Sequence, residues 1–391
     1  MTAPAAEAAP PPRLVSLNVV DHPDNGSQVG IVVKRTYVIR SGRCMVADEQ
    51  VPLVEVPGMI DDGAILGHDL DAVLNRRETD VIVAGKARPP SKTGTFDVRI
   101  NVGALDRRLT VFGPRKCWRA PTGELRFSLP EPVDEIDLGW SSAYGGVDTS
   151  FLETHEDPVE TFSKEADQPY NPRFGLYAYP RNRAGKGYLI EATDQALERC
   201  ELPNVEDPRR LLTPERLVIG KADRWPQGPL PAGVGWLSYA SFPRTAMLGM
   251  PPHFDASACP PESFEEVKLG LLKARAIAVA TPLQDRFDLG AAQQSAIGMR
   301  IAGLDPGALV ELHNCHPQLG RWSFALSRES PTMMLQMPGQ QAVAVQPKIR
   351  TVFLEPERER VCVVWVGEYR EPTPIGPGKQ AHIKHGVKWV G

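Results

Sequence analysis

Apolar and polar residues alternate most clearly in residues 95–102, where every second residue from Phe96 to Val102 is apolar. A period of two is typical of a β-strand, because successive side chains of a strand point to opposite faces. Residues 29–39 and 81–84 are runs of apolar and β-branched residues, which also predict strands. Residues 109–112 follow a turn, so we expect them to form a hairpin with 95–102.

Short apolar runs bounded by turn residues return beyond Gly290. They predict five more strands, at residues 309–312, 322–326, 341–345, 351–354 and 361–366.

Two segments have helical spacing instead. In residues 67–77, Leu70, Val73 and Leu74 recur at three- and four-residue steps, which predicts a short amphipathic helix. In residues 263–279, Ser263 and Glu266 have the spacing of a capping box. That segment predicts one helix, or a helix that runs into a strand at 276–279.

Between residues 131 and 262 regular periodicity nearly disappears, while prolines recur throughout. This stretch is nevertheless rich in Trp and Tyr, whereas disordered segments are poor in aromatic residues. We therefore expect an ordered but irregular section that is packed by aromatic side chains.

The chain of 391 residues contains 38 prolines and 34 glycines, which disfavour long helices. The expected fold is mainly β, of the α+β type. Two β units are joined by an irregular section rich in Pro, Gly and aromatic residues, with a few short helices. The expected segments are a disordered Ala/Pro tail at 1–13, an N-terminal β-rich unit at 14–130, the irregular section at 131–262, a C-terminal β-rich unit at 263–369 and a C-terminal extension at 370–391.

Charge and cysteine usage narrow the function classes. The net charge is -4, so no global positive field attracts nucleic acid or an anionic membrane, and neither is an expected partner. The six cysteines are widely spaced, which is typical of buried thiols in a reducing compartment. We identify no secretory signal and no apolar run long enough to span a bilayer. A cytoplasmic location is expected by elimination.

The densest group of potential metal ligands is His313-Asn314-Cys315-His316, which together with His253 and Cys259 offers enough nitrogen and sulfur for a zinc site. The spacing H-x-C-H matches no standard zinc motif, however. A strand end followed by a turn is the favoured interpretation, and we expect neither a metal nor another cofactor.

Two other motifs resemble catalytic elements only in part. Residues 182–187 look like a phosphate loop but lack its first glycine and its Ser/Thr, so a glycine turn is favoured. The acids Asp134, Glu135 and Asp137 would need a cleft that separates their pKa values to act as an acid/base pair, and loop acids in solvent are the simpler interpretation. Since no G-x-S-x-G elbow is present either, we expect that the protein is not an enzyme.

Further motifs follow one another along most of the chain. They occupy residues 79–87, 111–115 with Trp118, 143–146, 182–188, 202–208 (LPNVEDP), 231–236 with Arg244, 309–317, and 350–354 with 363–365. In this order they resemble domain-of-unknown-function family twenty-one sixty-nine, a bacterial family found in type VI secretion gene clusters. Arg183 replaces the proline usual in the family, and Val366 replaces a basic residue.

The resemblance implies a non-enzymatic adaptor or chaperone. Such proteins are thought to bind a secreted toxin effector, often through its PAAR-like region, and to help load it on the VgrG spike. Tyr and Trp give a large contact area at a low rotamer cost, so the irregular section is the expected partner surface. The residues expected to contact the partner are Tyr144, Tyr188, Trp225, Trp236 and Arg244. Burial in the core is the alternative for these side chains, and for Tyr144 and Trp236 it is slightly favoured, since Trp is highly buried on average.

Two rival functions stay open at this point. One is a metal-dependent hydrolase that uses His253, Cys259, His313 and His316, which elemental analysis would reveal. The other is a carbohydrate- or peptide-binding β module that uses tryptophans of the middle section, which a groove lined by exposed Trp and Tyr would favour.

Overall fold

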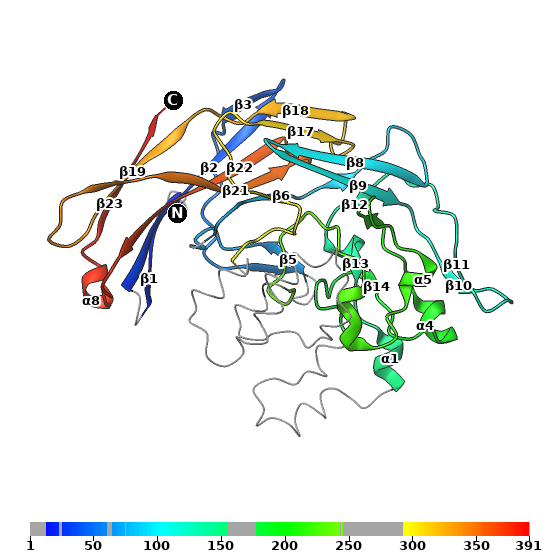
Figure 1. Ribbon diagram of the computed structural model, residues 1–391. Helices are drawn as coiled ribbons and strands as arrows, with labels where there is room; N and C mark the ends of the chain where they lie inside the picture. The colour runs from blue at the N-terminus through cyan, green and yellow to red at the C-terminus, as the bar shows by residue number, and fades with distance from the viewer. Residues whose placement is uncertain are drawn as a thin grey trace, which may run out of the picture.

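The computed structural model describes residues 13–22, 26–60, 65–74, 76–154, 177–242, 244 and 292–390 (Figure 1). Nearly all of the expected tail at 1–13 lies outside these residues, as does the helix expected at 263–279. His253 and Cys259 lie outside them as well.

The largest sheet has seven strands and combines both ends of the chain. Its order is β1 (Val15–His22), β2 (Gly26–Arg40), β22 (Arg360–Glu371), β21 (Pro347–Glu355), β6 (Thr79–Val83) and β16 (Arg300–Ile301), with β3 (Arg43–Val46) paired to the far end of β2. Neighbouring strands are antiparallel except β21 and β6, which are parallel.

A second sheet has five antiparallel strands (Figure 1). Its order is β15 (Val205–Glu206), β9 (Leu105–Phe112), β8 (Thr95–Val102), β17 (Leu309–His313) and β18 (Arg321–Ala325). Strands from the expected segments 14–130 and 263–369 therefore share both large sheets.

Smaller sheets complete the β structure. They are β20 (Val343–Val345) with β19 (Ser330–Gln336) and β23 (Lys384–Val390), β10 (Cys117–Arg119) with β11 (Leu125–Phe127), β7 (Lys86–Ala87) with β12 (Ile136–Asp137), β4 (Gly58–Ile60) with β5 (Ile65–His68), and the parallel pair β13 (Tyr144–Gly145) with β14 (Lys186–Gly187). In Figure 1, β19 and β23 lie at one end of the molecule and the β10–β11 hairpin lies at the other.

Helices in the described residues are short. They are α1 (Thr149–Thr154), α4 (Asp194–Arg199), α5 (Pro214–Leu217) and α8 (Pro377–Gln380), with 3-10 turns η2 (Trp140–Ser142), η3 (Ala222–Gln227) and η7 (Pro356–Arg358). The side chain of Thr193 caps α4 by accepting a hydrogen bond from the backbone of Ala196. The prediction of a mainly β fold with a few short helices is confirmed. None of the helices in the described part of the chain is long and apolar enough to cross a membrane.

The two large sheets share one apolar core. Val98, Ile100 and Val102 of β8 have no solvent exposure, and they belong to the same cluster as Val29 and Ile31 of β2. The alternation in residues 95–102 therefore marks the buried face of β8, as predicted. A second cluster is made largely by the irregular middle section and contains its buried tyrosines, Trp225 and Phe242.

The helix predicted at residues 67–77 is wrong. In the described residues 67–74 and 76–77, the chain forms the end of β5 and continues as turns and irregular backbone without helical hydrogen bonding. Asp69 caps the backbone N–H of Leu70, and Asp71 accepts from the backbone N–H of Val54. Aspartate side chains that bind backbone groups compete with helix formation, and here both aspartates are buried.

Candidate functional site

All five residues predicted to contact a partner are buried. Their exposed fractions are 2% for Tyr144, 2% for Tyr188, 0% for Trp225, 5% for Trp236 and 0% for Arg244. In this structure each of them has a packing role, so none of the five side chains forms an exposed surface.

Tyr179 is the centre of the aromatic packing in the middle section. Its ring meets Tyr144 edge-on at 5.0 Å between centroids, lies 5.2 Å from Tyr188, and meets Trp225 edge-on at 6.3 Å. The guanidinium of Arg181 lies over Trp225 and donates a 2.8 Å hydrogen bond to the hydroxyl of Tyr179. These contacts hold an irregular backbone in place without a regular sheet or a long helix.

Trp236 and Arg244 belong to a different part of the core. Trp236 packs against Phe353 of β21 with 5.4 Å between ring centroids. The guanidinium of Arg244 stacks on Tyr239, and its Nη1 donates to the carboxylate of Asp69. The residue that sequence reasoning placed on the surface therefore neutralises a buried acid.

The glycine motifs at 143–146 and 182–188 form one structural unit. Gly145 has φ +146, and an added Cβ would lie 2.1 Å from the carbonyl oxygen of Asn182. The amide of Asn182 donates to the carbonyl oxygens of Trp140 and Tyr144. The stretch that resembled a phosphate loop is thus a packed turn beside the parallel pair β13–β14.

The motif LPNVEDP at 202–208 attaches the middle section to the five-stranded sheet. Val205 pairs with Val111 of β9, and the side chain of Asn204 donates to the carbonyl oxygen of Phe112. Both acids of the motif form ion pairs with arginines: Glu206 pairs with Arg115, and Asp207 pairs with Arg107 at 2.7 Å.

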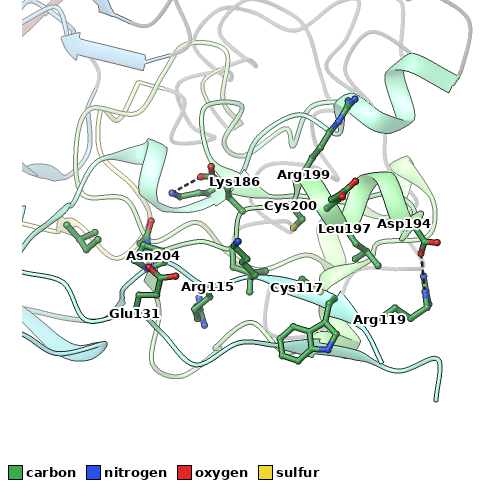
Figure 2. A pocket seen from close by; sticks show the side chains of 17 residues that line it. Arg115, Cys117, Arg119, Glu131, Lys186, Asp194, Leu197, Arg199, Cys200 and Asn204 are labelled. Carbon is green, nitrogen blue, oxygen red and sulfur yellow. Dashed lines mark hydrogen bonds and ion pairs between the residues drawn. The ribbon is translucent and has the colours of Figure 1, made fainter. Parts of the chain in front are cut away.

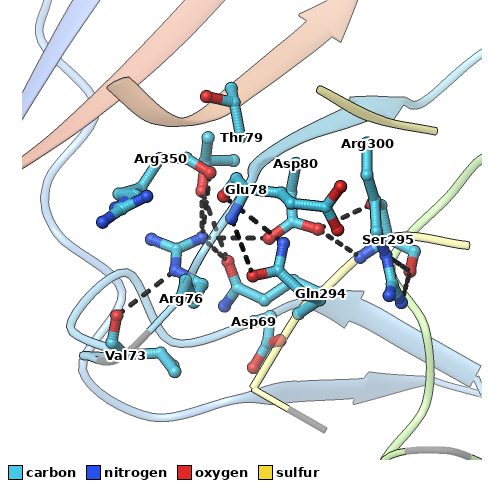
Figure 3. A network of polar contacts seen from close by, with 12 residues as sticks. Asp69, Val73, Arg76, Glu78, Thr79, Asp80, Gln294, Ser295, Arg300 and Arg350 are labelled. Carbon is cyan, nitrogen blue, oxygen red and sulfur yellow. Dashed lines mark hydrogen bonds and ion pairs between the residues drawn. The ribbon is translucent and has the colours of Figure 1, made fainter. Parts of the chain in front are cut away.

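A second polar network is buried beside β6 (Figure 3). Nη1 of Arg76 donates to Oγ1 of Thr351 at 2.6 Å and to Oε1 of Gln294 at 2.5 Å, and it pairs with Asp80 at 3.3 Å. Asp80 also accepts from the backbone and the hydroxyl of Ser295. Arg76 and Asp80 have fully buried side chains, so the network joins the loop before β6 to β21 and to residues 293–295 as a structural element.

The two histidines of the 313–316 cluster are engaged separately. His313 lies 2.6 Å from a carboxylate oxygen of Glu311, while His316 lies 3.3 Å from Glu359 and accepts from two backbone N–H groups of its own turn. Cys315 is buried, and burial raises its pKa to about 12. Within the described residues no group of three or more His, Cys, Asp or Glu is arranged to hold a metal ion.

The three candidate loop acids have local roles. Glu135 bonds to Lys86 and Arg88, Asp134 pairs with Lys92 at 3.3 Å, and Asp137 accepts from the backbone N–H of Gly139 at 2.6 Å. The three acids are bound to separate groups, which does not match an acid/base pair.

An open cleft of about 1030 Å³ lies between the β10–β11 hairpin and α4 (Figure 2). Trp118 lines it and is 44% exposed, which is unusual for such a large aromatic side chain. This residue is part of a family motif, but sequence reasoning did not single it out as a contact residue. The available signal was its position between the charged residues Lys116 and Arg119 in a short hairpin, KCWRAPTGELRF.

The walls of this cleft, which we call the Trp118 cleft, carry both charges. Arg119 and Asp194 lie 3.8 Å apart, and Lys186 and Glu201 lie 3.4 Å apart. Glu198 also lines the cleft and forms no ion pair among the described residues. The Trp118 cleft thus combines a half-exposed tryptophan with charged side chains of both signs.

The sequence profile of a bacterial protein family, described as an uncharacterized protein conserved in bacteria (DUF2169), matches residues 24–366. The chain belongs to this DUF2169 family. The match begins just before β2 and ends in β22, two strands that pair directly in the large sheet, so the DUF2169 region includes the pairing that joins the two ends of the chain. No curated protein and no solved structure matches this chain.

Proposed function

We propose that this DUF2169 protein is a non-enzymatic adaptor or chaperone of a type VI secretion system. In this role it binds a toxin effector, through the PAAR-like region of that effector, and helps load it on the VgrG spike. The resemblance of the ordered motifs to a family found in type VI secretion gene clusters supports this role.

The observation that carries the proposal is Trp118 on an open cleft. A rigid aromatic side chain that is half exposed in the free protein gains buried area when a partner covers it. The polar residues around it match the rim of a contact surface. The candidate catalytic groups of the sequence, within the described residues, are occupied by structural contacts instead.

Co-expression with the effector encoded beside this gene tests the proposal. Trp118→Ala should abolish co-purification while leaving the unfolding free energy nearly unchanged, because the side chain is half exposed. Leu309→Ala is the matched control, since Leu309 is 57% exposed at the start of β17 and does not line the Trp118 cleft, so this variant should retain the complex. Unchanged effector abundance and delivery after deletion of this gene would refute the adaptor role.

A further inference from the structure

A second cleft, of about 530 Å³, lies where three distant segments meet. Its walls come from the turn and first residues of β9, from residues 207–209 after β15, and from residues 298–302 around β16. We call it the arginine cleft, because Arg107, Arg108, Arg209 and Arg300 line it.

Two carboxylates in this cleft are each shared by two guanidinium groups. Asp207 accepts from Arg107 at 2.7 Å and also from Nη2 of Arg209 at 2.7 Å. Asp106 accepts two hydrogen bonds from Arg99, at 2.8 and 2.9 Å, and lies 3.7 Å from Arg108. Each of these groups of one acid and two arginines keeps one positive charge.

Asp207 is held in its charged form. Burial alone would raise the pKa of Asp207, but the hydrogen bonds from Arg209 and Arg107 outweigh burial and hold that pKa well below its usual range. Bonds from Arg99 likewise lower the pKa of Asp106. The surplus of positive charge therefore persists at neutral pH.

The arginine cleft has a buried interior and an exposed rim. Arg107 is 8% exposed, and its Nε has no hydrogen-bond partner within the described residues. Gly298 lies beside it, and a Cβ at that position would come within 3.4 Å of Nη1 of Arg107. The side chains of Arg108 and Arg209 are 63% and 79% exposed, so most of their donors face solvent.

The lining also contains apolar side chains, from Leu105, Pro208 and Ile301. Sites for a free phosphate usually present backbone N–H groups from a glycine-rich turn or a helix N-terminus. Here the donors are guanidinium groups, whose planar fork matches a carboxylate as well as a phosphate. The apolar lining beside them can cover aliphatic stems, which favours an acidic peptide segment over a free anion.

We propose that the arginine cleft binds an acidic segment of a protein, whose carboxylates pair with Arg108 and Arg209 while its aliphatic groups cover Leu105 and Pro208. The site is separate from the Trp118 cleft, and it does not depend on the adaptor role, because purified protein and a synthetic peptide are enough to detect it.

Fluorescence anisotropy of a labelled peptide that alternates Glu and Leu tests this proposal on the full-length protein. Binding should weaken at least about tenfold between about 50 and about 300 mM salt, because the rim charges are exposed to screening. The double variant Arg108→Glu/Arg209→Glu should weaken it at least about tenfold at low salt. Arg358→Glu is the matched control, since that side chain is 66% exposed on η7 and should leave binding unchanged.

Four results would overturn the proposal. They are equal binding of the peptide with Gln in place of each Glu, wild-type binding by the double variant, full displacement of the peptide by about 1 mM inorganic phosphate, and tighter binding of a single-stranded oligonucleotide than of the peptide. The third outcome would indicate a small-anion site, and the fourth a nucleic-acid surface. A circular dichroism spectrum identical to that of the wild type establishes that the double variant is folded.

Discussion

Arg244 and Asp69 form an ion pair of 2.6 Å in which neither side chain has any solvent exposure. The hydroxyl of Tyr239 also donates to Asp69, and the ring of Tyr239 lies under the guanidinium of Arg244. Because the two charges are taken out of water together, each depends on the other for compensation.

Removing one partner of the Arg244–Asp69 pair should lower the unfolding free energy far more than removing one partner of a surface ion pair. We expect Arg244→Ala and Asp69→Ala each to lower the unfolding free energy by about 3–5 kcal/mol, since an uncompensated charge then stays buried. Arg358→Ala should cost less than about 1 kcal/mol, because Arg358 is exposed in its pair with Glu355. Urea unfolding followed by tryptophan fluorescence measures the unfolding free energy of all three variants. Equal losses at the buried pair and at Arg358 would contradict this prediction.

Aromatic residues should separate into core and surface by their effect on the unfolding free energy. Trp225→Ala and Tyr144→Ala each remove a fully buried ring and should cost about 3–5 kcal/mol. Trp118→Ala should change the unfolding free energy by about 0.5 kcal/mol or less. If Trp225→Ala unfolds at the wild-type urea concentration, the aromatic packing around Tyr179 does not stabilise the fold.

Local sequence pattern was informative where a strand has one buried face. Residues 95–102 alternate because β8 packs on the shared core on one side only. The pattern does not encode which strands pair. β2 finds its partner β22 more than 300 residues away in the chain, and this pairing places the ends of the chain in one sheet.

Two expectations differ from the structure because local sequence does not show contacts between residues that are distant in the chain. Residues 67–77 have helical spacing, but Asp69 and Asp71 form contacts with distant residues such as Arg244 and Lys34, which local periodicity cannot anticipate. The middle section was expected to be ordered, and the structure describes residues 131–154, 177–242 and 244 of it. Composition alone does not distinguish a ring that packs inside, such as Tyr144 of the middle section, from one that faces solvent, such as Trp118 of the β10–β11 hairpin.

Gly145 should not tolerate a side chain. Its φ is +146, and a Cβ at this position would lie only 2.1 Å from the carbonyl oxygen of Asn182, which leaves no room for a methyl group. We expect Gly145→Ala to lower the unfolding free energy by about 1–3 kcal/mol. Gly303→Ala is the control, because nothing lies within 4 Å of its Cβ position, and that variant should unfold like the wild type. Thermal or urea unfolding distinguishes the two, and a neutral Gly145→Ala would mean that this turn adopts another conformation.

The thiols in the described residues should be unreactive in the folded protein. Burial raises the pKa of Cys44 and Cys117 to about 11 and that of Cys200 and Cys315 to about 12, so the reactive thiolate is scarce at pH 8. In a Cys259→Ser variant, iodoacetamide should label these cysteines slowly in native buffer and rapidly in urea. Mass spectrometry reads out the labelling, and rapid modification of Cys315 in native buffer would contradict its burial.

Asp207 should contribute to stability in a pH-dependent way. Its folded pKa is depressed, because the bonds from Arg209 and Arg107 outweigh the opposing effect of burial. A carboxyl group of this kind stabilises the fold above its unfolded pKa, about 3.9, and that contribution is lost as the pH falls toward the folded value. Asp207→Asn keeps the shape but removes the charge that compensates the buried Arg107, so it should lower the unfolding free energy by roughly 1.5–3 kcal/mol at pH 7.

The pH profile of the Asp207→Asn variant tests this directly. The difference in unfolding free energy between wild type and variant should stay constant from pH 7 to about pH 5 and shrink steadily below about pH 4. Asp106→Asn is the control, because Asp106 is 45% exposed and its loss should cost less than about 1 kcal/mol. Urea unfolding at a series of pH values measures the effect, and a difference that grows on acidification would show that Asp207 is not held as a carboxylate by the two arginines.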